Sequence, residues 1–287
     1  AVRMLGEKIG PERPCIVVRS PGRINLMGRH IDHQGGTCNL MAINREVVLA
    51  ASPRTDDRIN LWNVEDRQYP QRTFTIGELA ADMVWEDWLR TLNTQYIQRV
   101  VAGNAGDWVN YVQGVTLRLR HRFPERPLRG LDAVVTGNIP PGAGLSSSSA
   151  LVVAMGDALV ELNALNVDVQ EFVDLCGEGE WFVGTRGGSA DHAAIKLGRR
   201  DEVANVSFFP FEVRAHHPFP AGCCLVVCFS GITARKTMNA KGVFNARVAC
   251  YHMARELIKA RFPEFAERIA HLRDVNTERL DISLPAL

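Results

Sequence analysis

Two patterns of hydrophobic and polar positions run along the chain, and each predicts a different kind of element. Short β-branched runs bounded by turn-forming residues predict strands, over residues 15–20, 45–52, 131–140, 203–214 and 223–231. Apolar residues three and four positions apart predict helices, over residues 107–123, 147–165, 169–185 and 245–262. The stretch 21–36, rich in glycine and polar residues, is expected to lie largely in loops and short strand ends. Because the pattern changes after about residue 200, we predict two domains, 1–200 and 201–287.

Composition and charge exclude several classes of function. The chain has 287 residues, of which 46% are hydrophobic and 23% charged, the profile of a soluble globular protein. The formal net charge is +1 with acids and bases well mixed, so no surface for nucleic acid or a membrane is expected. No apolar run reaches the roughly 18 residues of a membrane span, and residues 1–14 lack the apolar stretch of a signal peptide. We therefore expect a cytoplasmic protein.

The seven cysteines follow no disulfide-scaffold spacing, which fits a reducing compartment. Three of them, Cys223, Cys224 and Cys228, crowd the segment "CCLVVCFS" and raise the possibility of a metal site. A buried strand is the favoured interpretation, because free cysteine behaves there as a small hydrophobic residue.

The segment "PPGAGLSSSSAL" (140–151) joins a predicted strand to a predicted helix. Gly142 and Gly144 allow the backbone to approach a ligand closely. The four serines 146–149 then begin the helix, whose first amides have no partner within it and favour an anion such as phosphate. One serine would suffice as a helix cap, so capping alone does not account for four. The segment is neither a Walker A loop nor a nucleophile elbow.

This segment resembles the phosphate loop of the GHMP kinases. Within that superfamily "SPGRINLMGRHIDHQGG" resembles the galactokinase signature, and "DWVNYVQGV" and "GTRGGSADHAAIKLG" resemble further galactokinase blocks in the family's order. The resemblance covers about residues 14–250. It implies that the ATP phosphates are bound by Gly142, Gly144, Leu145, Ser146, Ser147, Ser148 and Ser149.

Phosphoryl transfer to a hydroxyl needs a group that orients the hydroxyl and accepts its proton, and a cation that stabilises the transferred group. By resemblance, Asp191 in "GGSADH" matches the family's catalytic aspartate and Arg23 in "PGRIN" its partner arginine. On the residues alone, Asp191 could instead cap a helix and Arg23 could form a structural ion pair. If the two lie side by side, the arginine charge favours the ionised carboxylate.

The resemblance also implies Mg²⁺ ligands. Ser148 matches the family's magnesium-binding serine. The acidic ligand normally lies about a dozen residues before the catalytic aspartate, where this chain has Gly179. Glu178 and Glu180 flank that glycine, and either could supply the carboxylate.

Sugar recognition is implied for the "MGRHIDHQGG" segment. His30 and Asp32 match family residues that hydrogen-bond sugar hydroxyls, and Gly188 matches a backbone sugar contact. Phe244 takes the place of a tyrosine that lines the sugar pocket. A metal site made of His30, Asp32 and His33 is disfavoured.

Arg29 departs from the family, because galactokinases carry glutamate there to contact the C6 hydroxyl. Arginine only donates hydrogen bonds and suits a carboxylate. A sugar with a carboxylate at C6, such as galacturonate, would satisfy it. The alternative is that Arg29 turns to solvent or pairs with a nearby acid, and both interpretations stay open.

The resemblance implies an α+β, two-domain GHMP kinase fold with the active site in the cleft between domains. The implied reaction transfers the γ-phosphoryl group of ATP, with Mg²⁺, to the anomeric C1 hydroxyl of galactose or a related hexose. The implied partners are the sugar and ATP, without nucleic acid or membrane, in a monomer or small homo-oligomer.

Two alternatives are a uronic-acid kinase that reads a C6 carboxylate through Arg29, and a catalytically silent sugar sensor. The undeleted "GLSSSSA" favours an enzyme, and the galactokinase-like blocks disfavour a mevalonate-type kinase. The family's third motif, a glycine-rich loop near the C-terminus, is not found before the final "DISLPAL", so we expect an incomplete C-terminal domain.

Overall fold

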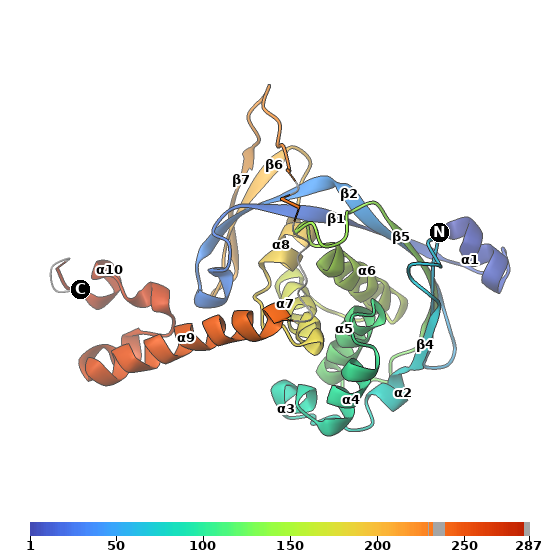
Figure 1. Cartoon of the computed structure of the whole chain (residues 1–287), viewed down its shortest axis with the longest axis horizontal. Coiled ribbons are helices and arrows are strands. Elements are labelled where there is room, and N and C mark those ends of the chain that lie inside the picture. The colour runs from blue at the N-terminus through green and yellow to red at the C-terminus, as the bar shows by residue number, and fades with distance from the viewer. Residues whose placement is uncertain (229, 232–238, 284–287) are drawn as a thin grey trace.

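The computed structural model describes residues 1–228, 230–231 and 239–283, and within these ranges it shows a seven-stranded mixed sheet covered by helices (Figure 1). The strands are β1 (Ile16–Met27), β2 (Thr37–Pro53), β3 (Arg58–Asn63), β4 (Arg72–Thr75), β5 (Leu131–Gly137), β6 (Glu202–Ser207) and β7 (Glu212–Pro218). Their order is β4-β3-β5-β2-β6-β7, with β1 paired to β2. The expected α+β class is confirmed.

The long strand β2 organises this sheet. Its residues 47–53 pair antiparallel with β5, and its residues 37–40 pair antiparallel with β6. On its other edge, β1 runs antiparallel to residues 39–51. Only the β3–β5 pair is parallel among the pairings described. One strand therefore connects the N-terminal β1 to both β5 and β6.

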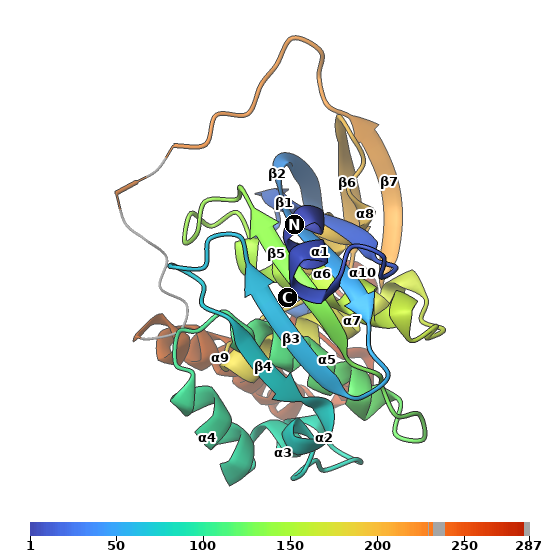
Figure 2. The same ribbon diagram turned by 90° about the vertical axis from the view of Figure 1, so that its right-hand side faces the viewer.

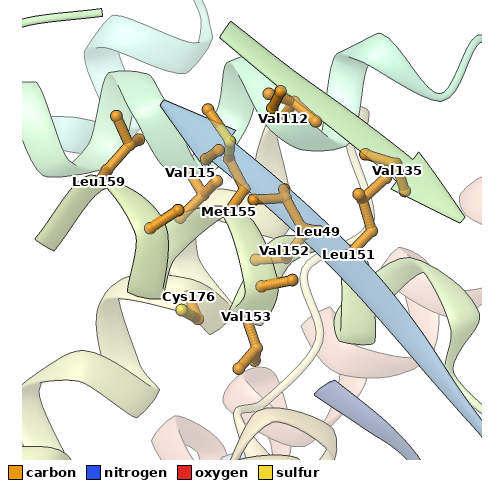
Figure 3. Packing of buried hydrophobic residues seen from close by; sticks show 14 of the residues in the cluster. Leu49, Val112, Val115, Val135, Leu151, Val152, Val153, Met155, Leu159 and Cys176 are labelled. Carbon is orange, nitrogen blue, oxygen red and sulfur yellow. The ribbon is translucent and has the colours of Figure 1, made fainter. Parts of the chain in front are cut away.

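One face of the sheet is covered by the four helices α5 (Val109–Arg122), α6 (Ser147–Leu162), α7 (Val169–Glu180) and α8 (Ala190–Leu197). Side chains alternate along a strand, so Leu49 and Val135 face the helices. Figure 3 shows them beside Leu151 and Met155 of α6. Helix α6 is apolar on most sides because it lies between the sheet and the neighbouring helices α5 and α7. Its predicted burial is confirmed.

The opposite face carries α1 (Val2–Ile9), where Leu5 packs on Ala50 and Val134. Three shorter helices, α2 (Ile76–Leu79), α3 (Trp88–Leu92) and α4 (Gln95–Gly103), form a separate hydrophobic cluster beside α5. Helix α9 (Asn239–Arg261) extends away from the sheet (Figure 1). Short 3-10 turns and α10 (Thr277–Leu280) follow it. Strands β6 and β7 join the same sheet as β2, and the predicted domain boundary near residue 200 stays a prediction.

Some predicted elements differ from the structure. The stretch 21–36, expected as loops and short strand ends, contains the whole second half of β1, because residues 23–27 pair with residues 39–42 of β2. The single strand expected over 203–214 is a hairpin of β6 and β7. The helix expected over 169–185 changes to a 3-10 turn after Glu180 and ends at Gly184, whose φ is 92°.

The strand expected over 223–231 was wrong for its described part. Residues 223–228 follow β7 as an irregular segment that leaves the sheet (Figure 2). Val226 is 78% exposed, and Cys223, Cys224 and Cys228 are exposed rather than buried. A segment with a strand-like sequence forms a strand only where a neighbouring strand is available to pair with it, and this segment runs away from β7. All seven cysteines are free, and within the described ranges no helix is long and apolar enough to cross a membrane.

Candidate active site

A cavity of about 1160 Å³ opens where the serine loop, the end of β1 and the start of α8 meet. The predicted residues that line it are Arg23, Arg29, His30, Asp32, Gly142, Gly144, Leu145, Ser146, Ser147, Ser148, Glu180, Gly188, Asp191 and Phe244. Two other predicted residues, Ser149 and Glu178, lie outside its lining. Segments distant in sequence thus converge on one space.

Arg23 and Asp191 form a two-point ion pair inside this cavity. Nε and Nη2 of Arg23 donate to the two carboxylate oxygens of Asp191, each over 2.6 Å. The third nitrogen, Nη1, donates to the Gly144 carbonyl over 2.8 Å. Arg23 is 9% exposed, so solvent screens its attraction to the Asp191 carboxylate only weakly. The pair ties β1 to α8 and to the serine loop.

The serine loop is held against β1 by close backbone contact. The Arg23 amide donates to the Leu145 carbonyl, and a side chain on Gly22 would place its Cβ 2.9 Å from that oxygen. Gly142 and Gly144 have φ values of 68° and 73°, which glycine adopts without strain. Ser146 precedes α6 with φ 60°. The loop therefore turns sharply into the N-terminus of α6.

The serine hydroxyls point to carboxylates rather than to the first amides of α6. Ser146 Oγ donates to Asp191 Oδ2 over 2.5 Å and makes no capping hydrogen bond. Ser148 and Ser149 donate to the two oxygens of Glu180 over 3.0 and 2.8 Å. Helix capping thus does not explain these three serines. The first amides of α6 have no acceptor within the helix.

The structure separates the two candidate magnesium carboxylates. Glu180 lies at the end of α7, lines the cavity and contacts Ser148. Its Oε2 is 3.0 Å from Nε2 of the buried His192. Glu178 instead accepts a hydrogen bond from Arg118 over 2.6 Å, outside the cavity lining. The described ranges contain no group of three or more His, Cys, Asp or Glu side chains placed to hold a metal ion.

The sugar segment is fixed to the start of α8. Asp32, which is 6% exposed, accepts a hydrogen bond from the Ala190 amide over 3.1 Å. A Cβ on Gly188 would lie 2.0 Å from Asp32 Oδ2, so only glycine fits there. The Asp32 carboxylate, to which the family resemblance assigns sugar binding, is thus bound to the backbone of the residue that precedes Asp191.

His30 and Arg29 occupy the turn that follows β1. His30 has φ 64°, and its ring meets the Phe244 ring edge-on at 5.6 Å. Desolvation lowers the pKa of His30 from its ordinary value, the Arg29 charge lowers it further, and Asp32 partly offsets both. Arg29 lines the cavity. Arg29 is exposed and forms no ion pair with the other described residues. Pairing with a nearby acid therefore does not account for it, whereas the interpretation that it faces solvent remains as an alternative.

Comparisons with known proteins show which families the chain resembles. The model of the galactokinase galactose-binding signature matches residues 6–53, and the model of the GHMP kinases N-terminal domain matches residues 110–199. A galactokinase of Chloroflexus aurantiacus is 31% identical over 268 residues, which cover 93% of this chain and 60% of the relative. Over these ranges the chain is similar to galactokinases and to the N-terminal domain of the GHMP kinases.

More distant relatives and solved structures share the fold. A galactokinase of Dictyostelium discoideum is 26% identical over 281 residues, covering 96% of this chain and 52% of the relative. The crystal structure of Lactococcus lactis galactokinase complexed with galactose superposes with a TM-score of 0.70 at 21% identity, covering all of this chain and 66% of that one. Methanococcus jannaschii mevalonate kinase gives 0.52 at 16% identity, covering 70% and 56%. The chain spans 52–60% of the curated galactokinases it matches.

Two further residues that shape the candidate site were not predicted from the sequence. Trp181 Nε1 donates to the Gly187 carbonyl over 2.7 Å, and Asn245 donates to the Gly184 carbonyl over 2.8 Å. Both therefore hold the loop that leads to Asp191. Asn245 directly follows Phe244, a predicted site residue, and this position could have indicated it. Nothing in the sequence indicated that Trp181 contributes to the site.

Aromatic residues form the other end of the cavity. Tyr69 and Trp108 meet edge-on at 6.3 Å, and both line the cavity with Tyr111. Burial and the nearby Glu180 raise the pKa of Tyr111, so its hydroxyl stays protonated at neutral pH. Helical spacing predicted that Trp108 and Tyr111 lie on one side of a helix, without indicating that they border the cavity.

Proposed function

We propose that this chain transfers the γ-phosphoryl group of ATP to the C1 hydroxyl of galactose or a related hexose. The observation that carries the proposal is the two-point pair of Arg23 and Asp191, with Ser146 on the same carboxylate. This pair lies between the serine loop on one side and the sugar segment on the other, within one cavity. Similarity to galactokinases supports the substrate class.

The phosphate end would be formed by the N-terminus of α6. Its first amides and the positive end of its dipole attract phosphate, and a Cβ on Gly144 would meet no atom within 4 Å, which leaves room for a ligand beside the loop. Tyr69 and Trp108 add aromatic surface to the cavity lining that would contact the base. Three phosphates and a nucleoside therefore have complementary groups along it.

The oxygen ligands that Mg²⁺ prefers are present beside that helix. The Ser148 hydroxyl and the Glu180 carboxylate face the same cavity. They would hold the ion together with phosphate oxygens. When bound, Mg²⁺ supplies positive charge that neutralises the phosphoryl oxygens.

Asp191 would orient the sugar hydroxyl and accept its proton as the phosphoryl group transfers. Because the paired Arg23 favours the ionised form, Asp191 acts as a weak base that accepts the proton late. The Arg23 guanidinium adds a fixed positive charge next to the transferred group. Asp32, His30 and the Gly188 backbone would hold the remaining hydroxyls of the sugar.

A second substrate is favoured by Arg29. It lines the cavity and has no acid partner among the described residues, so it is available to a ligand. A guanidinium that faces a sugar carboxylate forms a charge-assisted pair, whereas it can only donate to a hydroxyl. We therefore propose a hexuronate such as galacturonate as the alternative acceptor.

The test is ADP release by the full chain with MgATP and a panel that includes galactose and galacturonate. Loss of the sugar's reducing end, with one new phosphate ester signal in ³¹P NMR, identifies C1 as the acceptor. Arg29→Glu runs beside the wild type, with Arg45→Glu as the matched control, because Arg45 is exposed and outside the cavity.

Turnover on galactose alone supports the hexose kinase and excludes the uronate. If galacturonate is the better substrate, Arg29→Glu should shift preference toward galactose by about tenfold to a hundredfold, while Arg45→Glu shifts nothing. Binding of both ligands without ADP on any sugar rejects the kinase and supports a sensor.

A further inference from the structure

Arg273 contacts the sugar segment from a part of the chain that no motif covers. It lies in the 3-10 turn Leu272–Asp274, after α9. Its Nη1 donates to the Gly35 carbonyl, 238 positions away in sequence, and to the Phe208 carbonyl over 2.7 Å. One guanidinium nitrogen therefore joins the sugar segment to the turn between β6 and β7.

The sugar segment is shaped to admit this side chain. Gly35 has φ 79°, and a Cβ there would lie 2.8 Å from Arg273 Nε and 2.9 Å from Cδ. Any larger residue would displace the guanidinium. The close approach and the left-handed backbone thus both require glycine at position 35.

The contact continues to the residues of the site. The Gly35 amide donates to the Asp32 carbonyl, which closes the turn that carries Asp32 and His33. The Asp32 carboxylate in turn accepts from the Ala190 amide, next to Asp191. Arg273 therefore holds one end of this turn at Gly35, and Asp32 at the other end binds the start of α8.

Resting on the proposed function, we infer that Arg273 is a positioning residue for sugar binding. It touches neither the cavity lining nor the Arg23–Asp191 pair. Its effect is to hold the turn 31–36 closed, so that Asp32 and His30 face the sugar in a fixed geometry. A residue of this kind changes affinity for the sugar while leaving affinity for ATP as it is.

Arg268 provides a matched control. It lies in the same C-terminal segment and also donates to a backbone carbonyl, that of Arg279, without contacting the sugar segment. Arg268→Ala therefore removes a comparable arginine–carbonyl contact away from the site. Arg273→Lys keeps the charge and one donor, and serves as the conservative variant.

The experiment uses the full chain and two readouts. The first is hydrogen exchange at the amides of residues 34–36, which are hydrogen-bonded within the turn and report its opening without any sugar. The second compares KM for galactose, or the preferred sugar, with KM for ATP and with kcat. A thermal denaturation midpoint identifies any variant that is unfolded.

For Arg273→Ala we expect about tenfold faster exchange in the turn and about tenfold higher sugar KM, from the loss of a charge-assisted hydrogen bond. KM for ATP should stay within about twofold, Arg273→Lys should restore part of the loss, and Arg268→Ala should resemble the wild type. Unchanged exchange and sugar KM in Arg273→Ala, or equal effects in Arg268→Ala, overturn the inference. If the wild type turns over no sugar, the proposed function fails, and the exchange of residues 34–36 still decides whether Arg273 holds the turn.

Discussion

Both carboxylate oxygens of Asp191 accept hydrogen bonds from Arg23, over 2.6 Å each. Such a fork fixes the plane of the carboxylate as well as its distance. Ser146 adds a third donor to Oδ2. Asp191 is therefore oriented without any ligand, so the proton transfer proposed for it would require little rearrangement of the protein.

Asp191→Asn should lower kcat by about a hundredfold to ten-thousandfold, the usual contribution of a positioned base. The amide oxygen accepts from only one Arg23 nitrogen, because the amide nitrogen is a donor like the guanidinium, so we expect a lower thermal denaturation midpoint beside the loss of kcat. Steady-state kinetics and circular dichroism check this. Asp157→Asn is the control, because Asp157 of α6 pairs with Lys196 of α8 and neither residue lines the cavity. A variant with wild-type kcat would remove Asp191 from the chemistry.

Glu180→Gln should raise the Mg²⁺ concentration needed for half-maximal activity by about tenfold or more, because it replaces a charged ligand by a neutral one. Glu178→Gln is the paired control two residues away, and it breaks only the ion pair with Arg118. That pair is partly exposed, so its loss should cost less than about 1 kcal/mol of unfolding free energy. Magnesium titrations of both variants decide between the two acids. An equal shift in both, or a shift in Glu178→Gln alone, contradicts the assignment of Glu180.

Gly188→Ala should reduce sugar affinity strongly, because the new Cβ would lie 2.0 Å from Asp32 Oδ2 and must displace that carboxylate. Gly187→Ala adds the same methyl group one residue earlier, where no atom lies within 4 Å. Calorimetric titration with sugar should therefore give a loss of about tenfold or more for Gly188→Ala and a near-normal value for Gly187→Ala. Equal affinities would show that the sugar does not depend on the position of Asp32.

Arg29→Gln should raise the pKa of His30, since the Arg29 charge is one cause of its lowered value. A histidine whose folded pKa is lowered binds fewer protons when folded than when unfolded. His30 therefore destabilises the fold as the pH falls below its ordinary value of 6.5. Arg29→Gln should reduce this loss.

An NMR titration of the histidine ring signals measures the shift directly, with Arg45→Gln as the control for a change of net charge. A His30 pKa that stays the same or falls in Arg29→Gln would show that Arg29 does not act on this ring.

The chemistry of the site could be predicted where it depends on local residue types. A glycine-rich turn before a helix that begins with serines predicts phosphate binding, which stays a prediction, and the family resemblance singled out Arg23 and Asp191. The two residues prove to be in contact. The main helices were also predictable, because their apolar spacing reflects burial that the structure confirms for α6.

The remaining features depend on how distant elements meet. Choosing Glu180 over Glu178 requires the rotation of α7 relative to α6, which no spacing within α7 reveals. Arg273 acts from an irregular turn, where no periodic pattern marks a contact. The segment 223–228 has the composition of a buried strand, but pairing depends on a neighbouring edge rather than on composition.

The residues that form the contacts of the candidate site lie far apart in the sequence, and this limits when those contacts can form during synthesis. Arg23 lies 168 positions from Asp191, and Asp32 lies 158 from Ala190. During synthesis β1 and β2 can pair as soon as residue 53 is available, but the partners of Arg23 and Asp32 on α8 do not yet exist. Contacts at such separation form late, because closing a long loop costs entropy before they contribute. Both partners, Asp191 and Ala190, lie at the start of α8, so a nascent chain that ends before α8 can form neither contact.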